Sequence, residues 1–171
     1  GDPVYGNADD PVRFAVSKLA HLHFTLAEDY AKNLKQVGEE EFRIFNVGDP
    51  ALDTIRTTAT RDLKELGNTL KFDITDGRYV VLIRNPLSSE WQESGRQMEI
   101  TLQALEQFCK ESGYKVIAIY PNTDPGAHDV VAVIQNYEGK SFIKFYKTLE
   151  REIFVNVMRH ARALVGNSSM G

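Results

Sequence analysis

The chain has 171 residues, of which 42% are hydrophobic and 26% are charged, with a formal net charge of −4 at pH 7. This composition predicts a globular protein that forms one domain or parts of two. The charges are mixed and form no basic stripe, which argues against nucleic acid as a partner. Cys109 is the single cysteine, which excludes an internal disulfide and a cysteine-based metal site. Its position in an apolar helical pattern predicts a buried structural thiol.

The apolar runs of the sequence are short. The longest, such as residues 116–120, have the length of a strand and not of a membrane span. The first residues lack the basic-then-apolar order of a signal peptide. We therefore expect no membrane association and a reducing, cytoplasmic compartment.

The first 48 residues show turn chemistry followed by alternating helix and strand patterns. A helix is expected to begin at Asp9-Asp10-Pro11, because a capping carboxylate precedes a proline. Strands are expected at residues 21–26 and 42–47, with a helix at 27–37 between them. Alternation in the first strand would place His21 and His23 on one face. Gly48-Asp49-Pro50 breaks regular structure, so we expect a domain boundary there, with one domain at residues 1–48 and another at 49–171.

The second part alternates regularly between strands and helices. Helical patterning covers residues 54–76. Strands are then expected at 79–84, 115–120, 142–146 and 164–165, and helices at 90–112, 128–136 and 149–162. Phe108 is expected on the apolar face of the first of these helices. Strands separated by helices of this length indicate right-handed βαβ crossovers and a parallel sheet, so the expected fold class is α/β.

Three of these strands end in polar loops, at residues 85–89, 121–126 and 167–169. Because the carboxyl ends of parallel strands meet at one sheet edge, the loops predict a ligand crevice. In the last loop, Gly166 and Gly171 would let backbone approach a ligand, and Ser168 and Ser169 suit phosphate oxygens. The alternative is an ordinary strand-to-helix turn, in which Asn, Ser and Gly are common as caps.

Five sequence blocks, in order, resemble the UDP-N-acetylglucosamine 2-epimerases, and within them the hydrolysing branch that feeds sialic-acid-type sugar synthesis. The blocks are residues 9–13 (DDPVR), 18–23 (KLAHLH), 47–53 (VGDPALD), 120–126 (YPNTDPG) and 166–171 (GNSSMG). The resemblance implies the GT-B arrangement, two Rossmann-like domains with parallel sheets facing each other across a cleft. The chain would then hold the C-terminal part of the first domain and the N-terminal part of the second, UDP-binding one. We therefore expect a portion of a larger protein that forms a homodimer when complete.

The resemblance also implies which residues form the site. The catalytic candidates are Asp10, Arg13, His21, His23 and Asn85. The substrate-binding candidates are Asn122 and Asp124 at the sugar, Leu149 and Phe154 at the uracil, and Asn167, Ser168 and Ser169 at the diphosphate. The partner is a UDP-sugar, with no metal or other cofactor. Structural alternatives are open for Phe154, as a core residue, and for the two histidines, as a hydrogen-bonded structural pair.

Two positions depart from the family pattern. Asn85 and Phe14 stand where the family has histidines; Asn cannot exchange a proton near neutral pH, and Phe cannot even hydrogen-bond. The nucleotide half of the site therefore matches the family, while the proton-transfer half is altered. At Asn85 the change signals either impaired chemistry or a different sugar.

The reaction that the resemblance implies converts a UDP-2-acetamido sugar into UDP and the C2-epimerised sugar. The C2 proton leaves as UDP departs from C1, and water then adds to the glycal. This requires a base, such as Asp10 or a carboxylate upstream of the chain, charge stabilisation for the diphosphate, and exclusion of stray water. Two alternatives are a nucleotide-sugar-binding protein without turnover and a GT-B glycosyltransferase.

Overall fold

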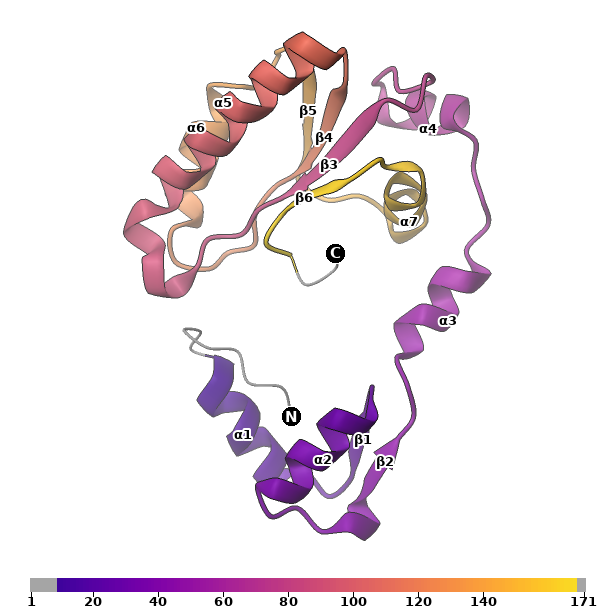
Figure 1. Cartoon of the computed structure of the whole chain (residues 1–171), viewed down its shortest axis with the longest axis vertical. Helices are drawn as coiled ribbons and strands as arrows, with labels where there is room; N and C mark the ends of the chain where they lie inside the picture. The colour runs from indigo at the N-terminus through magenta and orange to yellow at the C-terminus, as the bar shows by residue number, and fades with distance from the viewer. Residues whose placement is uncertain (1–8, 169–171) are drawn as a thin grey trace. The chain divides into compact units, whose positions relative to one another are not determined.

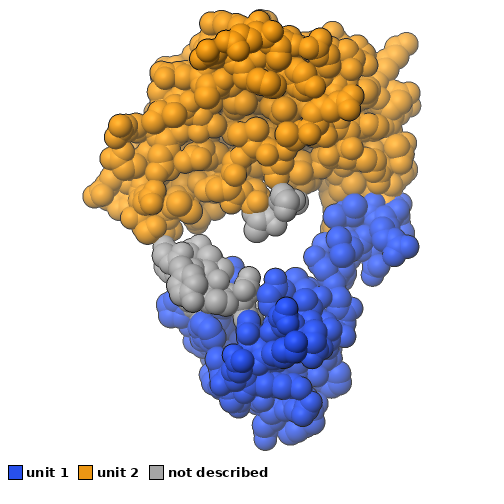
Figure 2. All heavy atoms as spheres, in the orientation of Figure 1, with its two compact units in different colours: residues 1–57 blue, residues 58–171 orange. Residues whose placement is uncertain are grey.

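The structure is a computed structural model that describes residues 9–168. Its contacts divide the chain into unit 1, Gly1–Thr57, and unit 2, Thr58–Gly171 (Figure 2). The expected domain boundary between residues 48 and 49 stays a prediction. At that position Asp49 Oδ1 accepts the N–H of Ala51 at 2.8 Å, and helix α3 (Pro50–Thr57) begins. The break predicted from glycine and proline is thus also a helix start.

Unit 1 contains a short parallel pair of strands joined by a helix. Its elements are α1 (Asp9–Leu19), β1 (His23–Thr25), α2 (Glu28–Gln36), the 3-10 turn η1 (Glu41–Arg43), β2 (Ile44–Asn46) and α3. The order agrees with the sequence pattern, although both strands are shorter than expected. Phe24 and Phe45 pair in register across β1 and β2, with ring centroids 5.8 Å apart. Both rings are exposed.

Unit 2 is built on a four-stranded parallel sheet with the order β5-β4-β3-β6. Its elements are α4 (Leu63–Leu70), β3 (Tyr79–Ile83), η2 (Ser88–Glu93), α5 (Ser94–Ser112), β4 (Lys115–Ile119), α6 (Ala127–Gln135), β5 (Ile143–Tyr146), α7 (Arg151–His160) and β6 (Leu164–Gly166). The parallel pairing confirms the α/β prediction.

Helices cover both faces of this sheet, α5 and α6 on one side and α4 and α7 on the other (Figure 1). The side chains of β3 alternate between the two layers. Val80 and Leu82 belong to the core cluster with α5 and α6. Tyr79, Val81 and Ile83 belong to the cluster with α4 and α7. Burial on both faces explains why β3 reads as a nearly continuous apolar run.

Two details of α5 differ from the sequence prediction. The α-helix begins at Ser94 and not at residue 90, because η2 precedes it and Glu90 has non-helical backbone angles (φ −128°, ψ 27°). Phe108, expected on the apolar face, is 41% exposed and packs beside Tyr114. Cys109 is buried as predicted, and burial raises the pKa of its thiol to about 11. It is therefore a protonated structural residue at neutral pH.

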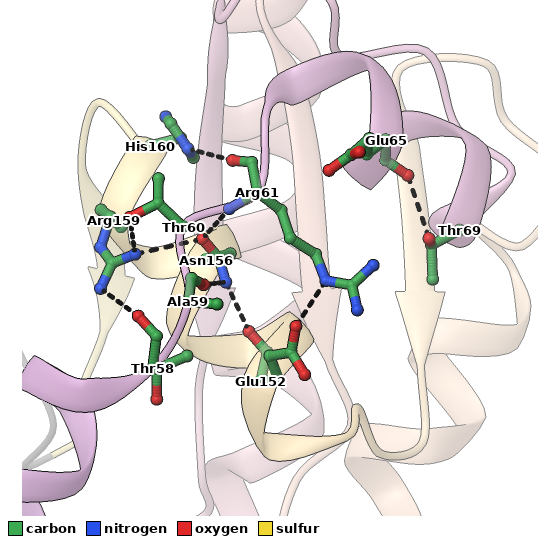
Figure 3. A network of polar contacts seen from close by, with 10 residues as sticks. All are labelled: Thr58, Ala59, Thr60, Arg61, Glu65, Thr69, Glu152, Asn156, Arg159 and His160. Atoms are coloured by element: carbon green, nitrogen blue, oxygen red, sulfur yellow. Dashed lines mark hydrogen bonds and ion pairs between the residues drawn. The ribbon is translucent and has the colours of Figure 1, made fainter.

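The segment 58–61, with which unit 2 begins, is fixed to α7 (Figure 3). Asn156 on α7 is fully buried. Its Oδ1 accepts the N–H of Arg61 at 2.9 Å, and its Nδ2 donates to Ala59 O at 2.9 Å. Arg61 Nε also donates to Glu152 Oε1 at 2.6 Å. These bonds join segments nearly 100 residues apart in the sequence.

Across residues 9–168, no helix combines the length and the apolar character needed to cross a membrane.

Candidate functional site

The strands of unit 2 end at one level. Ile83 of β3 pairs with Ile119 of β4 and with Gly166 of β6, and Ile119 pairs with Tyr146 of β5. The loops that follow β3, β4 and β6 therefore share one sheet edge, which confirms their predicted convergence.

The chain makes a topological switch between β3 and β6. It runs outward from β3 through β4 to β5 and then returns to the other side of β3 at β6. In open α/β sheets, ligands bind in the crevice beyond the carboxyl ends of the strands at such a point. The geometry thus selects the β3 and β6 loops as the centre of the candidate site.

Asn85 and Asn167 join these two loops. The N–H of Asn85 donates to Asn167 Oδ1 at 2.8 Å, and Asn167 Nδ2 donates to the carbonyl oxygen of Asn85, also at 2.8 Å. The N–H of Asn167 donates in turn to Ile83 O at 3.2 Å. One side-chain amide therefore satisfies both backbone groups of Asn85 and fixes its position.

The β4 loop is attached to the same residue. The N–H of Asn122 donates to Asn85 Oδ1 at 3.1 Å. The side chain of Asn122 is used inside its own loop, where Nδ2 donates to Asp124 Oδ2 at 2.6 Å and Oδ1 accepts the N–H of Asp124 at 3.3 Å. We call the bonds that link Asn85, Asn122 and Asn167 the asparagine clamp.

Gly166 has a structural role that the sequence analysis missed. Its φ is +138°, and a Cβ at this position would overlap the carbonyl group of Ile83. The missing side chain makes room for β3, which is a sufficient reason for glycine here; approach of a ligand to this backbone stays a prediction. Gly171 lies outside the described residues.

The remaining substrate-binding candidates differ in position. Ser168 is half-buried just after the clamp, while Ser169 lies outside the described residues. Leu149 lies in the loop between β5 and α7, and Phe154 lies on α7. Both pack, half-buried, against the core layer of α4 and α7. This packing agrees with the structural alternative for Phe154 and leaves part of its ring accessible.

Arg84, the residue directly after β3, is a feature of this edge to which the sequence analysis gave no role. Its half-buried guanidinium donates through Nη2 to Gln97 Oε1 at 2.8 Å, and Gln97 Nε2 donates to Glu90 Oε2 at 2.7 Å. A fixed cation at the strand end suits an anionic ligand. In the sequence, the position of an arginine at the end of a buried strand could have indicated this feature.

The two histidines of unit 1, which are both catalytic candidates, do not form a pair on one strand face. Because β1 begins only at His23, His21 lies before the strand and is exposed, while His23 is buried. The prediction that both lie on one face is therefore wrong. Arg13 is exposed on α1, as is Phe14, which is 38% exposed. Asp10 lies in the first turn of α1, with its side chain outside the described part.

His23 is held by Glu39, a buried carboxylate that the sequence analysis did not single out. His23 Nε2 donates to Glu39 Oε2 at 3.1 Å, and Arg43 Nη2 donates to the same oxygen at 2.9 Å. Lys18 Nζ lies 2.7 Å from Glu39 Oε1. The hydrogen bond from Lys18 is the main reason why the pKa of the Glu39 carboxyl lies below its ordinary value of 4.5. Glu39 therefore ties α1, β1 and η1 together.

The lowered pKa predicts a pH-dependent stability. Glu39 should contribute fully above its unfolded-state pKa, and the contribution should be lost as the pH falls through the lower folded-state value. Glu39→Gln should therefore destabilise unit 1 at about pH 7, and the gap to the wild type should be smaller at about pH 3. Urea unfolding of the complete protein at both pH values measures this. Glu40→Gln, an exposed neighbour that also pairs with Arg43, is the control and should have a small effect at both. A constant gap would contradict the assignment.

Comparisons with known proteins agree with this arrangement. Residues 1–171 match the family described as UDP-N-acetylglucosamine 2-epimerase. The chain is 34% identical over 168 residues to the UDP-N,N'-diacetylbacillosamine 2-epimerase (hydrolyzing) of Legionella pneumophila, covering 97% of this chain and 43% of that protein. It is 30% identical over 171 residues to the UDP-N-acetylglucosamine 2-epimerase of Neisseria meningitidis, covering 100% of this chain and 44% of that protein.

The fold is shared with a solved structure. The crystal structure of UDP-GlcNAc 2-epimerase from Neisseria meningitidis bound to UDP-GlcNAc superposes with a TM-score of 0.77 at 17% identity, covering 98% of this chain and 46% of that one. This confirms the α/β, GT-B-like fold with parallel sheets. The chain spans less than half the length of the proteins it matches. On the match of its whole length, the chain belongs to the UDP-N-acetylglucosamine 2-epimerase family.

Proposed function

We propose that the complete protein is a hydrolysing 2-epimerase that converts a UDP-2-acetamido sugar into UDP and the free C2-epimerised sugar, in the synthesis of sialic-acid-type sugars. The observation that carries the proposal is the asparagine clamp, which joins the β3, β4 and β6 loops at the switch point. The hydrolysing outcome is supported by the Legionella pneumophila relative, whose name specifies hydrolysis.

In this proposal the nucleotide is bound by unit 2. Ser168, Ser169 and the adjacent N–H groups hold the diphosphate, and Arg84 contributes positive charge from the same edge. Asn122 and Asp124 form the wall near the sugar. The backbone near Leu149 contacts the edge of uracil, and the accessible part of Phe154 contacts its face.

The chemistry breaks the C2–H and C1–O bonds of the sugar, giving UDP and a glycal. Water then supplies a hydroxyl to C1 and a proton to C2 from the face that inverts C2. Asp10, or a carboxylate outside the chain, is the base, and Arg13 and His21 stabilise charge. His23 orients β1 through Glu39 and does not touch the sugar.

A binding protein without turnover is the second candidate. It is favoured by Asn85 and Phe14, which replace the two histidines of the family pattern. Such a protein would bind UDP-sugars through the same clamp and release no product.

Release of UDP by the complete protein distinguishes the hydrolysing epimerase from the alternatives. UDP should form from UDP-N-acetylglucosamine, or from a UDP-2,4-diacetamido sugar, when no acceptor is added, and a coupled assay measures it. Release that depends on an added acceptor would instead indicate a glycosyltransferase. Binding of the UDP-sugar with no release would indicate the second candidate.

The diphosphate assignment gives a separate prediction. Ser169→Ala in the complete protein should weaken UDP binding by about 1–3 kcal/mol, because a hydrogen bond to a charged group is lost. Titration calorimetry measures this. Ser141→Ala is the control, because Ser141 is exposed just before β5, at the opposite edge of the sheet. Equal UDP affinity in the two variants would contradict the phosphate loop.

A further inference from the structure

Asn85 uses its side-chain amide on one side only. Its Oδ1 accepts the N–H of Asn122 at 3.1 Å. Because a backbone N–H can pair only with the oxygen of the amide, this bond fixes which end of the amide faces the β4 loop. Within residues 9–168, Nδ2 has no hydrogen-bond partner. The half-buried side chain therefore presents an N–H donor without a partner in this range at the switch point.

The backbone of Asn85 is held as firmly as its side chain. Both its N–H and its carbonyl oxygen bond to the Asn167 amide at 2.8 Å. The Nδ2 donor is thus fixed relative to the β3, β4 and β6 loops together. A donor preorganised in this way loses little conformational entropy when an acceptor binds to it.

The position of this donor, beside the β4 loop, indicates what it binds. Under the proposed function, the diphosphate takes its donors from Ser168, Ser169 and Arg84. The β4 loop that Asn85 holds presents Asn122 and Asp124, with Asn122 engaged by Asp124. A lone amide donor beside that loop matches a neutral oxygen, such as an acetamido carbonyl or a sugar hydroxyl.

We propose that Asn85 is a specificity-determining residue that orients the sugar by donating to a neutral sugar oxygen, and that it transfers no proton in the reaction. This inference rests on the proposed function and decides between the two interpretations of the departure at this position. An amide does not titrate near neutral pH, and its oxygen is already engaged by Asn122. Asn85 therefore selects a substrate and does not mark lost chemistry.

The test compares the affinities of UDP and UDP-N-acetylglucosamine by calorimetry on the complete protein. Asn85→Ala should weaken the UDP-sugar at least about tenfold and UDP less than about threefold, because only the sugar loses a partner. Asn167→Ala is the matched control. It breaks the clamp but keeps the Asn85 side chain, so, unlike Asn85→Ala, it should clearly weaken UDP as well as the UDP-sugar. An unchanged ratio of the two affinities in Asn85→Ala would overturn this inference and leave the proposed function intact.

Kinetics separate orientation from proton transfer. Asn85→Ala should act mainly by raising KM and should leave the shape of the pH profile of kcat/KM unchanged. Asn85→His should add no new ionisation to that profile and no tenfold gain in rate. A gain of at least about tenfold, with a new ionisation near the pKa of histidine, would overturn the inference. Failure of the wild type to bind UDP would overturn the proposed function and this inference with it.

Discussion

Replacing Gly166 by alanine should lower the free energy of unfolding of unit 2 by about 3 kcal/mol or more. Two costs combine at this position. The φ of +138° disfavours any side chain, and the new Cβ would overlap the Ile83 carbonyl in the neighbouring strand. Because backbone and not a flexible side chain is in the way, β6 must shift. The Asn167 end of the clamp would move with it, so UDP binding should weaken as well.

Gly139→Ala separates these two costs. Gly139 also has positive φ, at +86°, but a Cβ there would meet no atom within 4 Å. Its substitution should therefore cost only the backbone strain, about 1 kcal/mol. Urea unfolding of the complete protein, followed through Trp91 in unit 2, compares the two variants. Equal destabilisation would show that the contact between β3 and β6 is not what requires glycine.

Asn156→Ala should destabilise unit 2 by about 2–4 kcal/mol, because a buried amide that holds three backbone groups is removed. The fully buried amide accepts from the N–H of Arg61 and donates to the carbonyl oxygens of Ala59 and Glu152, all at 2.9 Å. Alanine has no polar side-chain atom, so these three backbone groups would lose their hydrogen-bond partner at position 156. In this variant, hydrogen exchange should become faster at the Arg61 amide, with a smaller change at the amides of β3 and β4.

Arg159→Ala is the contrast for this prediction. Arg159 holds the same segment from the exposed side, with Nη1 donating to Thr60 Oγ1 at 2.8 Å. Since solvent replaces exposed hydrogen bonds at little cost, this variant should lose about 1 kcal/mol or less. If the two substitutions cost the same, the buried amide would not be the main anchor of segment 58–61.

Much of unit 2 could be predicted from the sequence because local signals agree with its fold. The apolar run of β3 reports burial on both faces, and the polar residues after the strands mark the edge where ligands bind. The sequence pattern could not supply the strand order. The position of β6 beside β3 depends on Gly166 accommodating the Ile83 carbonyl, a contact between residues 83 positions apart.

The same limit explains what was missed within the site. Asn85 was singled out for the histidine it replaces, but its bonds to Asn122 and Asn167 depend on three loops meeting. Glu39 gave no sequence signal, because its partners come from α1, β1 and η1. In β1 the period-2 pattern was correctly recognised, but the strand starts at His23, so the exposure of His21 could not be inferred from alternation.

The clamp is made of neutral amide and backbone groups. None of them titrates between about pH 4 and pH 9, so the arrangement of the three loops should not depend on pH in that range. Any pH dependence of turnover should then arise from the groups that move protons, with Asp10 first among the candidates in this chain. Under the proposed function, pH would thus affect the groups that move protons and not the loops of unit 2 that bind the nucleotide.

Proton NMR of the reaction in D2O tests the central claim most directly. The complete protein, incubated with UDP-N-acetylglucosamine or a UDP-2,4-diacetamido sugar, should yield UDP and a free sugar with inverted C2 and deuterium at C2. Deuterium is expected because the C2 proton is removed and a solvent proton is added. An intact UDP-sugar that appears as a mixture of C2 epimers would contradict hydrolysis, and a free sugar that retains C2 configuration and its original hydrogen would contradict epimerisation.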